Sequence, residues 1–194
     1  FMEKFAIPFP IKVISSQIGL SHVPVHKVKG WSDAVADRAA GMIDKEREIE
    51  CARLILEFQL TMKEEIDRRQ ASPGDDLLQH LIDARLDDGE PLCDAELLSI
   101  LQQLMVGGNE TTTSTLGAGM LSFCNNPKIV LDAQHEPAVI PKLVEEVLRM
   151  ESPAQGVWRK VNHDTELAGV AIPAGAMVMI RLAAANRDPS VFEN

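Results

Sequence analysis

The chain has 194 residues, of which 45% are hydrophobic and 25% are charged, a composition typical of a globular protein with one sizeable core or two small ones. Its formal net charge of −10 argues against nucleic acid or an anionic membrane as the main partner, because both attract clustered lysines and arginines. The three cysteines, Cys51, Cys93 and Cys124, lack C-x-x-C spacing, which indicates neither a disulfide framework nor a structural zinc site and favours a reducing cytoplasm. No uncharged apolar run reaches the roughly 20 residues that a membrane span requires.

Both ends of the chain look internal. Phe1 is not an initiator residue, and the sequence stops at Asn194 after a turn-like segment, in a region where strands are expected to pair with later residues. We therefore expect the chain to be an internal fragment of a longer protein.

The first part of the chain predicts helices. Residues 1–20 indicate a short extended piece and then a helix that is opened by the prolines of PFP. Residues 23–41 and 46–70 have helical periodicity, and the second of these segments has acids near its start and arginines near its end, as the helix dipole favours. A breaker at 71–76 precedes a further short helix with one apolar face.

A long helix and a change of periodicity follow. The pattern of residues 94–124 stays helical, and at about 1.5 Å per residue it predicts a rod on the order of 45 Å. Pro127 stops this helix, and shorter helices follow, one of them over 140–150. After Pro153 the apolar residues alternate with period two, which predicts short strands or hairpins. The chain is therefore predicted to be mainly α with a minor β region near its end.

The long helix contains an unusual stretch, LMVGGNETTTSTL at 104–116. Glycine in a helix interior costs about 0.5–1 kcal/mol relative to alanine, so Gly107 and Gly108 predict a local distortion and would also let a flat group approach the backbone. Glu110 places a carboxylate in the middle of the rod beside the hydroxyl of Thr111, which suggests a proton relay. The alternative is a partly exposed helix whose acid faces solvent and whose glycines permit close helix packing.

Three further features are weak when each is taken alone. Glu146 and Arg149 form an E-x-x-R that places both charges on one helix face, although an exposed pair of this kind contributes less than about 1 kcal/mol and is common by chance. Arg159 points opposite to its strand neighbours and suits a carboxylate or phosphate partner, or it is a solvated strand arginine. The histidines are isolated or separated by proline, which does not indicate a metal site.

In their joint order, these features resemble a known family. The chain resembles the bacterial soluble cytochrome P-450 monooxygenases in the order of five motifs. These are a helix with G-G-x-[DE]-T-T, then E-x-x-R, a single arginine, D-x-E-L-x-G-x-x-I-P-A-G-x-x-V and A-N-R-D-P-x-x-F. The matching pieces lie at 107–112, 146–149, 159, 164–178 and 185–192. Each motif alone is weak, whereas their common order is specific, and the resemblance spans nearly the whole chain. It implies that the chain is the central part of the cytochrome P-450 fold.

The resemblance implies roles for the residues of the long helix. That helix would pass over one face of a haem b, and Gly107 and Gly108 would make room for the ring and for O₂. Glu110 and Thr111 would be the acid–alcohol pair that delivers protons during oxygen activation.

The resemblance also implies roles for residues outside the motif on that helix. Glu146 and Arg149 would form a buried structural ion pair behind the haem, and Arg159 would bind a haem propionate. An apolar pocket for a small hydrophobic substrate would be lined by residues from two segments, Leu104, Met105, Gln155, Gly156 and Val157.

The parent enzyme would insert one oxygen atom of O₂ into a C–H bond of that substrate, using electrons from a ferredoxin- or flavodoxin-type protein. We expect a cytoplasmic monomer with neither nucleic acid nor a membrane as a partner.

One part of the family pattern is missing. The family's iron is held by a cysteine in a loop of the type F-x-x-G-x-x-x-C-x-G, and all three cysteines of this chain lack that glycine framework. We therefore expect the ligand beyond Asn194, and we expect residues 1–194 to be a partial cytochrome P-450 domain, truncated at both ends and inactive alone. The alternative is a non-catalytic helical fragment or interaction module derived from such an enzyme. A helical carboxylate metalloenzyme is less supported, because D-x-x-H at 132–135 is the nearest approach to its paired E-x-x-H motifs.

Overall fold

A computed structural model describes residues 1–192. The chain divides into two compact units, Phe1–Thr113 and Ser114–Asn194. The predicted fold class, mainly α with small β elements near the end, is confirmed. Among the described residues, no helix combines the length and the apolar character that crossing a membrane requires.

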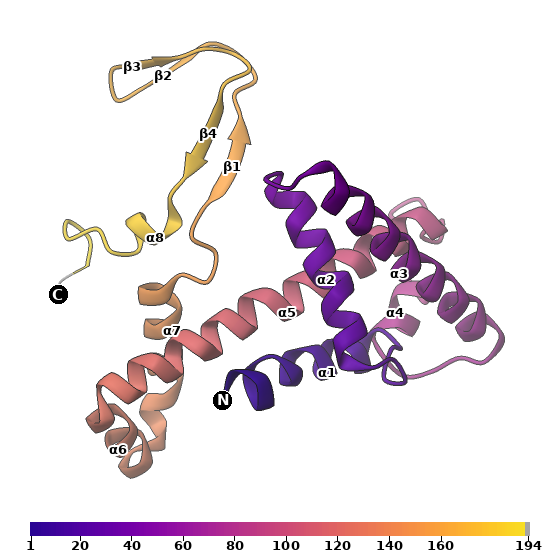
Figure 1. The fold of residues 1–194 in the computed structure, drawn as a ribbon, viewed down its shortest axis with the longest axis horizontal. Coiled ribbons are helices and arrows are strands. Elements are labelled where there is room, and N and C mark those ends of the chain that lie inside the picture. The colour runs from indigo at the N-terminus through magenta and orange to yellow at the C-terminus, as the bar shows by residue number, and fades with distance from the viewer. Residues whose placement is uncertain (193–194) are drawn as a thin grey trace. The chain divides into compact units, whose positions relative to one another are not determined.

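The first unit is helical (Figure 1). Its elements are η1 (Met2–Ala6), α1 (Pro8–Gln17), α2 (Val25–Ala40), α3 (Lys45–Ala71), α4 (Leu77–Asp83) and the first part of α5 (Asp94–Asn125).

We expected an extended piece before α1, and this prediction is wrong, because Met2–Ala6 form a π-helical turn. Phe5 of this turn stacks on Phe9 of α1, with ring centroids 5.2 Å apart, and its ring centroid lies 5.4 Å from that of Phe1. A helical backbone brings residues four apart together and an extended one does not, so this aromatic ladder favours the turn.

Side-chain caps and a glycine mark the helix ends in the first unit. Asp44 accepts the N–H of Arg47 at 2.8 Å and begins α3, and Asp76 accepts the N–H of Gln79 at 3.1 Å and begins α4. Gly41 ends α2 with a φ of +67°, a conformation that glycine adopts without steric cost.

The core of the first unit forms around Trp31 of α2 and Phe58 of α3, whose rings meet edge to face with centroids 5.6 Å apart. Helix α5 contributes Leu97, Leu101 and Met105, which recur every four residues and therefore share one helix face. The buried cluster consists of Ile11, Ile18, Leu20, Val28, Trp31, Phe58, Met62, Ile66, Leu78, Leu97, Leu101 and Met105. Each such side chain contributes roughly 1.5–3 kcal/mol on burial.

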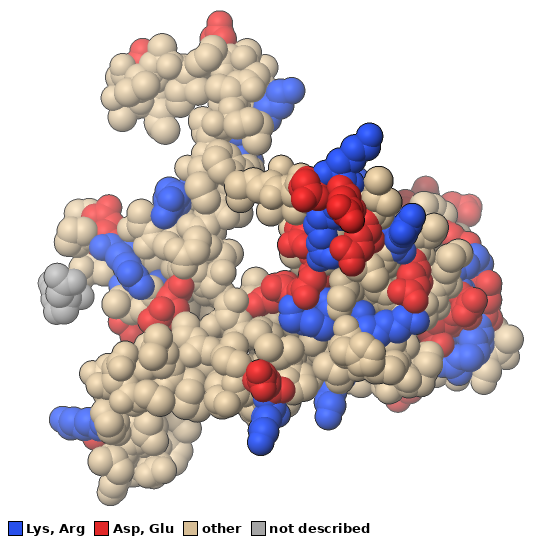
Figure 2. All heavy atoms as spheres, in the orientation of Figure 1, with Lys and Arg blue, Asp and Glu red and all other residues tan. Residues whose placement is uncertain are grey.

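Acidic and basic side chains are interspersed on the visible face of α2 and α3 (Figure 2). Several of them pair, as Arg47 does with Asp37 and Glu50, at 2.7 Å in each case. Exposed pairs of this kind contribute little to the stability of the fold.

The second unit combines short helices with two hairpins. After the end of α5 its elements are α6 (Pro127–His135), η2 (Pro137–Val139), α7 (Ile140–Glu151), β1 (Val157–Lys160), β2 (Thr165–Leu167), β3 (Val170–Ile172), β4 (Met177–Ile180) and α8 (Leu182–Ala185). Strand β1 pairs antiparallel with β4, and β2 pairs antiparallel with β3. The tight turn between β2 and β3 is made by Ala168 and Gly169, both with positive φ, as two-residue hairpin loops favour.

Candidate functional site

An open face of α5 is built from Gly107 and Thr111, which lie one helical turn apart. The hydroxyl of Thr111 donates a hydrogen bond to the carbonyl oxygen of Gly107 at 3.0 Å. A Cβ atom built on Gly107 would meet no other atom within 4 Å, so the glycine faces open space. Leu104, three residues before Gly107, shares this side of the helix and is half-buried. This face can therefore accept a flat group directly against the backbone.

Gly108 has different surroundings. A Cβ atom there would lie 3.2 Å from Cγ1 of Ile14, closer than ordinary van der Waals contact. The missing side chain therefore lets α1 approach α5, which favours close helix packing, the alternative that the sequence left open for the glycines. We also expected the glycines to distort the helix. This prediction is wrong at the level of secondary structure, since all of Asp94–Asn125 is α-helical. Packing against α1 supports the backbone where the two glycines weaken its intrinsic helix preference.

Glu110 lies beside Lys29 and Ser32 of α2. Its Oε1 atom is 3.7 Å from the ammonium of Lys29 and accepts hydrogen bonds from Ser32 at 3.4 Å and from the Asn109 amide at 3.3 Å. The side chain is 38% exposed. These donors and the remaining water offset the cost of placing a carboxylate in the middle of a helix.

Asn109 is a functional candidate that the sequence analysis missed. It is completely buried, and its amide donates to Ser32 at 3.0 Å while its carbonyl oxygen lies 3.3 Å from the Thr113 hydroxyl. That hydroxyl is also 3.1 Å from the carbonyl oxygen of Ala6. A buried amide bonded at both ends has one favoured rotamer, so Asn109 fixes the position of Ser32 against Glu110. The available signal was a polar residue four positions after buried Met105, on an otherwise apolar helix face.

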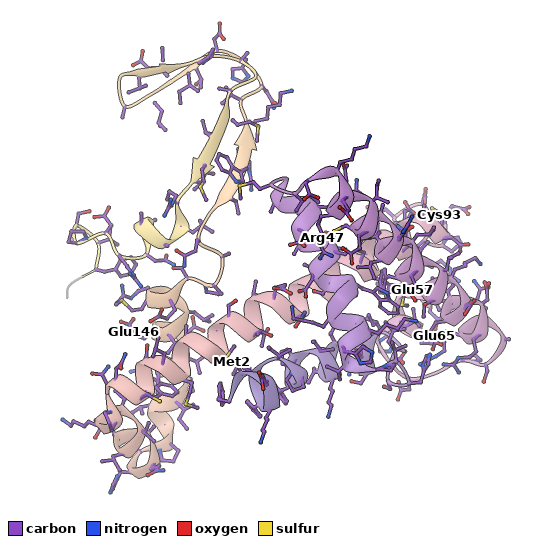
Figure 3. The ribbon with its side chains drawn as sticks, in the orientation of Figure 1. Met2, Arg47, Glu57, Glu65, Cys93 and Glu146 are labelled. Atoms are coloured by element: carbon purple, nitrogen blue, oxygen red, sulfur yellow. The ribbon has the colours of Figure 1, made fainter. Side chains whose placement is uncertain are left out.

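The E-x-x-R motif forms a two-pronged ion pair on α7, where Figure 3 labels Glu146. Arg149 donates from Nε to Oε2 of Glu146 at 2.7 Å and from Nη2 to Oε1 at 2.5 Å. These hydrogen bonds lower the pKa of Glu146 and raise that of Arg149. The Glu146 side chain is 54% exposed, so within the described residues the pair is half-exposed and not buried as the resemblance implied.

Arg149 also holds the segment that contains ANRDP. Its Nη1 atom donates to the carbonyl oxygen of Asn186 at 2.7 Å, and its guanidinium lies 4.8 Å from the ring centroid of Phe192. The Asn186 amide in turn donates to the hydroxyl of Ser152 at 3.0 Å. Two motifs that are far apart in sequence therefore form one structural feature, which we call the α7 latch: Glu146, Arg149, Ser152, Asn186 and Phe192.

Arg159 lies exposed on β1 opposite Val178 of β4. Its Nη1 atom donates to the carbonyl oxygen of the neighbouring Trp158 at 2.8 Å. Within residues 1–192 no carboxylate forms an ion pair with this guanidinium, which leaves it accessible to an anionic group.

The residues predicted to line a substrate pocket have mixed surroundings. Met105 is completely buried in the core of the first unit, and a Cβ atom on Gly156 would lie 2.6 Å from the carbonyl oxygen of Ile180. Both placements serve packing. Gln155 donates to the carbonyl oxygens of Glu151 and Ser152 at 3.0 and 2.9 Å and is exposed. The last two predicted residues, Leu104 and Val157, are half-buried.

The three cysteines do not form a metal site. Cys51 is buried in α3, whereas Cys93 and Cys124 are exposed, and Cys93 directly precedes α5 (Figure 3). The Cys93 N–H donates to the carboxylate of Glu96 at 2.8 Å, which lowers the pKa of Glu96. In the part of the chain that the structure describes, no group of three or more His, Cys, Asp or Glu side chains could hold a metal ion.

The fold has close counterparts among solved structures. The ligand-free structure of cytochrome P450 TbtJ1 superposes with a TM-score of 0.90 at 30% sequence identity, over 100% of this chain and 51% of that one. In sequence, the family profile of cytochrome P450 matches residues 43–194. The chain therefore belongs to the cytochrome P450 family, and the predicted family is confirmed.

Among curated bacterial relatives, the chain is 33% identical over 194 residues to cytochrome P450 107B1 of Saccharopolyspora erythraea, covering 100% of this chain and 46% of that protein. It is 34% identical over 194 residues to 6-deoxyerythronolide B hydroxylase of the same organism, covering 98% of this chain and 46% of that protein. The chain thus spans about half the length of the curated relatives that it matches.

Proposed function

We propose that the complete protein is a haem-dependent monooxygenase and that residues 1–194 are part of a cytochrome P450 domain. It would insert one oxygen atom of O₂ into a C–H bond of a small hydrophobic substrate, while the other atom leaves as water with protons from solvent and electrons from a partner protein. The observation that carries this proposal is the open face of α5, where Gly107 exposes backbone and Thr111 binds that glycine's carbonyl oxygen.

Gly107 and Arg159 are the residues that we propose would bind the haem directly. Gly107 would lie against the ring, because a Cβ atom there would occupy the open space, and Arg159 would pair with a propionate. Gly108 would act indirectly, by letting α1 pack against α5. When bound, haem b with a thiolate ligand supplies the activation of O₂, and we propose that this thiolate comes from outside residues 1–194.

Glu110 and Thr111 would move protons from solvent to the open face. The Glu110 carboxylate is half-exposed and is held at the α2 side by Lys29 and Ser32, where it can exchange protons with water. Thr111 follows it in the helix, and its hydroxyl is aimed at the Gly107 carbonyl, next to the open space. The acid would supply the proton, and the alcohol would hold it at the reacting side.

The substrate would contact Leu104 beside this face, and we propose Val157 and the exposed Gln155 of the second unit as further contacts. Met105 and Gly156 would support them by packing. One relative is a 6-deoxyerythronolide B hydroxylase, which supports oxygen insertion as the reaction class. A ferredoxin- or flavodoxin-type protein would supply the electrons.

The direct test is the carbon-monoxide complex of the reduced complete protein. We expect the absorption signature of a thiolate-ligated haem. A protein that folds but takes up no haem would overturn the proposal and would favour the other function, a non-catalytic helical interaction module.

Replacing Thr111 with alanine tests the relay in the same protein. We expect the fraction of consumed reductant that yields product to fall about tenfold or more, because a general acid that is out of position loses rate by such factors. Thr112→Ala is the matched control, since Thr112 is an exposed neighbouring hydroxyl of the same type. Unchanged coupling in Thr111→Ala would remove this residue from the relay.

A further inference from the structure

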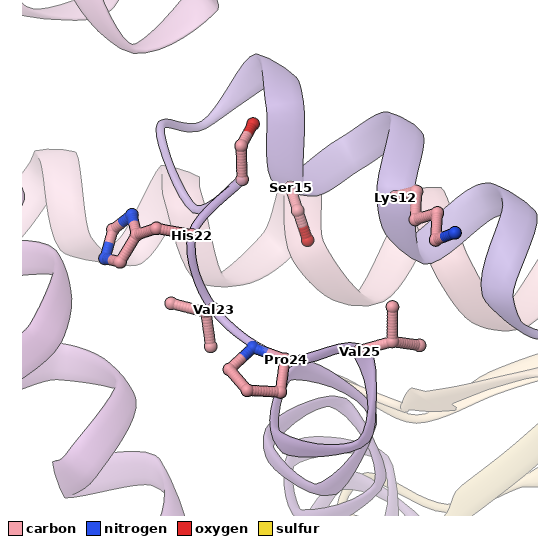
Figure 4. A pocket seen from close by; sticks show the side chains of 7 residues that line it. Lys12, Ser15, His22, Val23, Pro24 and Val25 are labelled. Atoms are coloured by element: carbon pink, nitrogen blue, oxygen red, sulfur yellow. The ribbon is translucent and has the colours of Figure 1, made fainter.

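A pocket of about 400 Å³ lies where α1 turns into α2 (Figure 4). Lys12 and Ser15 of α1 form one wall, and residues 21–25 form the other. The turn results from Gly19, which has a φ of +81°, and from a hydrogen bond of 2.7 Å between the N–H of Leu20 and the carbonyl oxygen of Ser15. This C-terminal end of α1 reverses the direction of the chain, so that residues 21–25 run back alongside the helix.

The hydroxyl of Ser15 is buried and has no hydrogen-bond partner among the described residues. The residue is 5% exposed, and Figure 4 shows its oxygen pointing from α1 toward the segment of Val23 to Val25. Its neighbour Ser16 instead donates to the carbonyl oxygen of Val13 at 2.7 Å. A buried hydroxyl without a partner is unfavourable, so a ligand that supplies a hydrogen bond here gains affinity.

The beginning of α2 adds further donors to the same pocket. The helix has 16 residues, and its N-cap, Pro24, provides no side-chain cap. The N–H groups of Val25 and His26 therefore lack partners within the helix, and Val25 lines the pocket. Helix N-termini of this kind carry partial positive charge and attract anions.

One side chain of the pocket, Lys12, carries the matching positive charge. Lys12 contributes an ammonium and His22 an imidazole, and in Figure 4 they lie at opposite ends of the pocket. Among residues 1–192, no aspartate or glutamate lines it, although the chain as a whole carries a net charge of −10. Val23 and Pro24 complete the wall with apolar surface.

We propose that this pocket binds a small organic anion, a carboxylic acid or a phosphate monoester. The oxyanion group binds the Ser15 hydroxyl, the first N–H groups of α2 and the Lys12 ammonium, and the apolar part of the ligand covers Val23 and Pro24. The pocket volume lies within the range of small-molecule sites, about 300–1,000 Å³. This binding does not depend on the proposed reaction, because it uses none of the residues assigned to that reaction.

The test follows the backbone amide signals of Val25 and His26 by NMR in the isotope-labelled complete protein. Inorganic phosphate, acetate and hexanoate are titrated separately, with chloride holding the ionic strength constant. We expect saturable shifts, and we expect Ser15→Ala to weaken binding about tenfold, the effect of a lost hydrogen bond to a charged group. Ser16→Ala is the matched control and should bind like the unaltered protein.

Lys12→Gln provides a second variant on an exposed side chain, so that folding is not at risk, and it should weaken binding several-fold. Saturation by phosphate assigns the site to phosphate esters, and saturation by hexanoate more tightly than by acetate assigns it to carboxylic acids with an apolar part. Shifts that do not saturate, or that are equal in Ser15→Ala and Ser16→Ala, would overturn the proposal, because both results mean non-specific charge screening.

Discussion

The two units of the chain are stabilised by different interactions. The first unit buries large side chains completely, with Trp31 and Phe58 at the centre of the cluster. Within the described part of the second unit, Val147 is the single buried apolar side chain, and large ones such as Leu121 and Trp158 are 63% and 56% exposed. The second unit is instead held by the α7 latch and by the hydrogen-bonded pairs of its strands.

This difference has an expected energetic consequence. Burial contributes roughly 1.5–3 kcal/mol for each large side chain, whereas a hydrogen bond contributes about 0.5–1.5 kcal/mol net. We therefore expect amide hydrogen exchange to be slower in the first unit, and we expect each unit to respond to a different kind of substitution.

The largest expected effect is that of Phe58→Ala. Emptying this completely buried position should cost about 3–5 kcal/mol and should speed amide exchange in α2 and α3, as measured by mass spectrometry of peptides from each unit. Leu56→Ala is the control in the same helix, because Leu56 is 54% exposed and its loss should matter little. Equal loss of protection in both units would contradict the expectation that each unit responds to a different kind of substitution.

Next in size is Arg149→Met, which keeps the length of the side chain and removes its donors. It breaks the bonds to Glu146 and to the carbonyl oxygen of Asn186, and should destabilise the second unit less than Phe58→Ala destabilises the first. Exchange should become faster in α7 and α8 and stay unchanged in α2. Lys142→Met is the control, an exposed cation on the same helix, and an effect of equal size there would mean that the latch is unimportant.

The two glycines of α5 provide a matched pair with opposite signs. Gly108→Ala should destabilise the first unit by about 1–3 kcal/mol, because the new methyl group meets Ile14. In the absence of haem, Gly107→Ala should instead stabilise the helix by about 0.5–1 kcal/mol, because its Cβ atom enters open space. Thermal unfolding of both variants gives the comparison, and the same sign for both would refute the assignment of the two glycines to different surroundings.

The smallest expected effect is a pH dependence of the second unit. The hydrogen bonds from Arg149 lower the pKa of Glu146 in the folded state, so their stabilisation is complete above the ordinary pKa of a glutamate. It is lost as the pH falls through the lowered folded-state pKa, and it amounts to less than about 1 kcal/mol because the pair is half-exposed. Amide exchange of α7 measured against pH should show this loss, and Glu146→Gln should remove it. Glu145→Gln, a change at the exposed neighbour, should leave it in place.

The sequence predicted local structure well where the signals are local. Helical periodicity and the breaker at 71–76 placed the helices, and alternation after Pro153 placed the short strands. The turn at Met2–Ala6 was predicted wrongly, because the prolines at the start of α1 said nothing about the stacking of Phe5 on Phe9.

The candidate site was predictable only in part, because the sequence identifies its residues but not the helices that pack around them. GGNETT identified the residues, but only the packing of α1 separates Gly108 from Gly107. The donors to Glu110 come from α2, far away in sequence, and Asn109 became a candidate only when Ser32 was seen beside it. Likewise, the partner of Arg149 beyond its own helix, Asn186, could not be inferred from the spacing of E-x-x-R.

The contrast between the two glycines also fixes the rotational phase of α5. A helix turns about 100° per residue, so consecutive residues face different surroundings. Gly107 and Thr111 face open space, Gly108 faces α1, Asn109 belongs to the buried amide network, and Glu110 faces α2. Deleting one residue between Leu101 and Gly107 would rotate residues 107–111 together by about 100° relative to the buried face of α5 that precedes them. The number of residues between the core part of α5 and its polar motif is therefore as constrained as the residues themselves, and single-residue insertions or deletions there should be less tolerated than most substitutions.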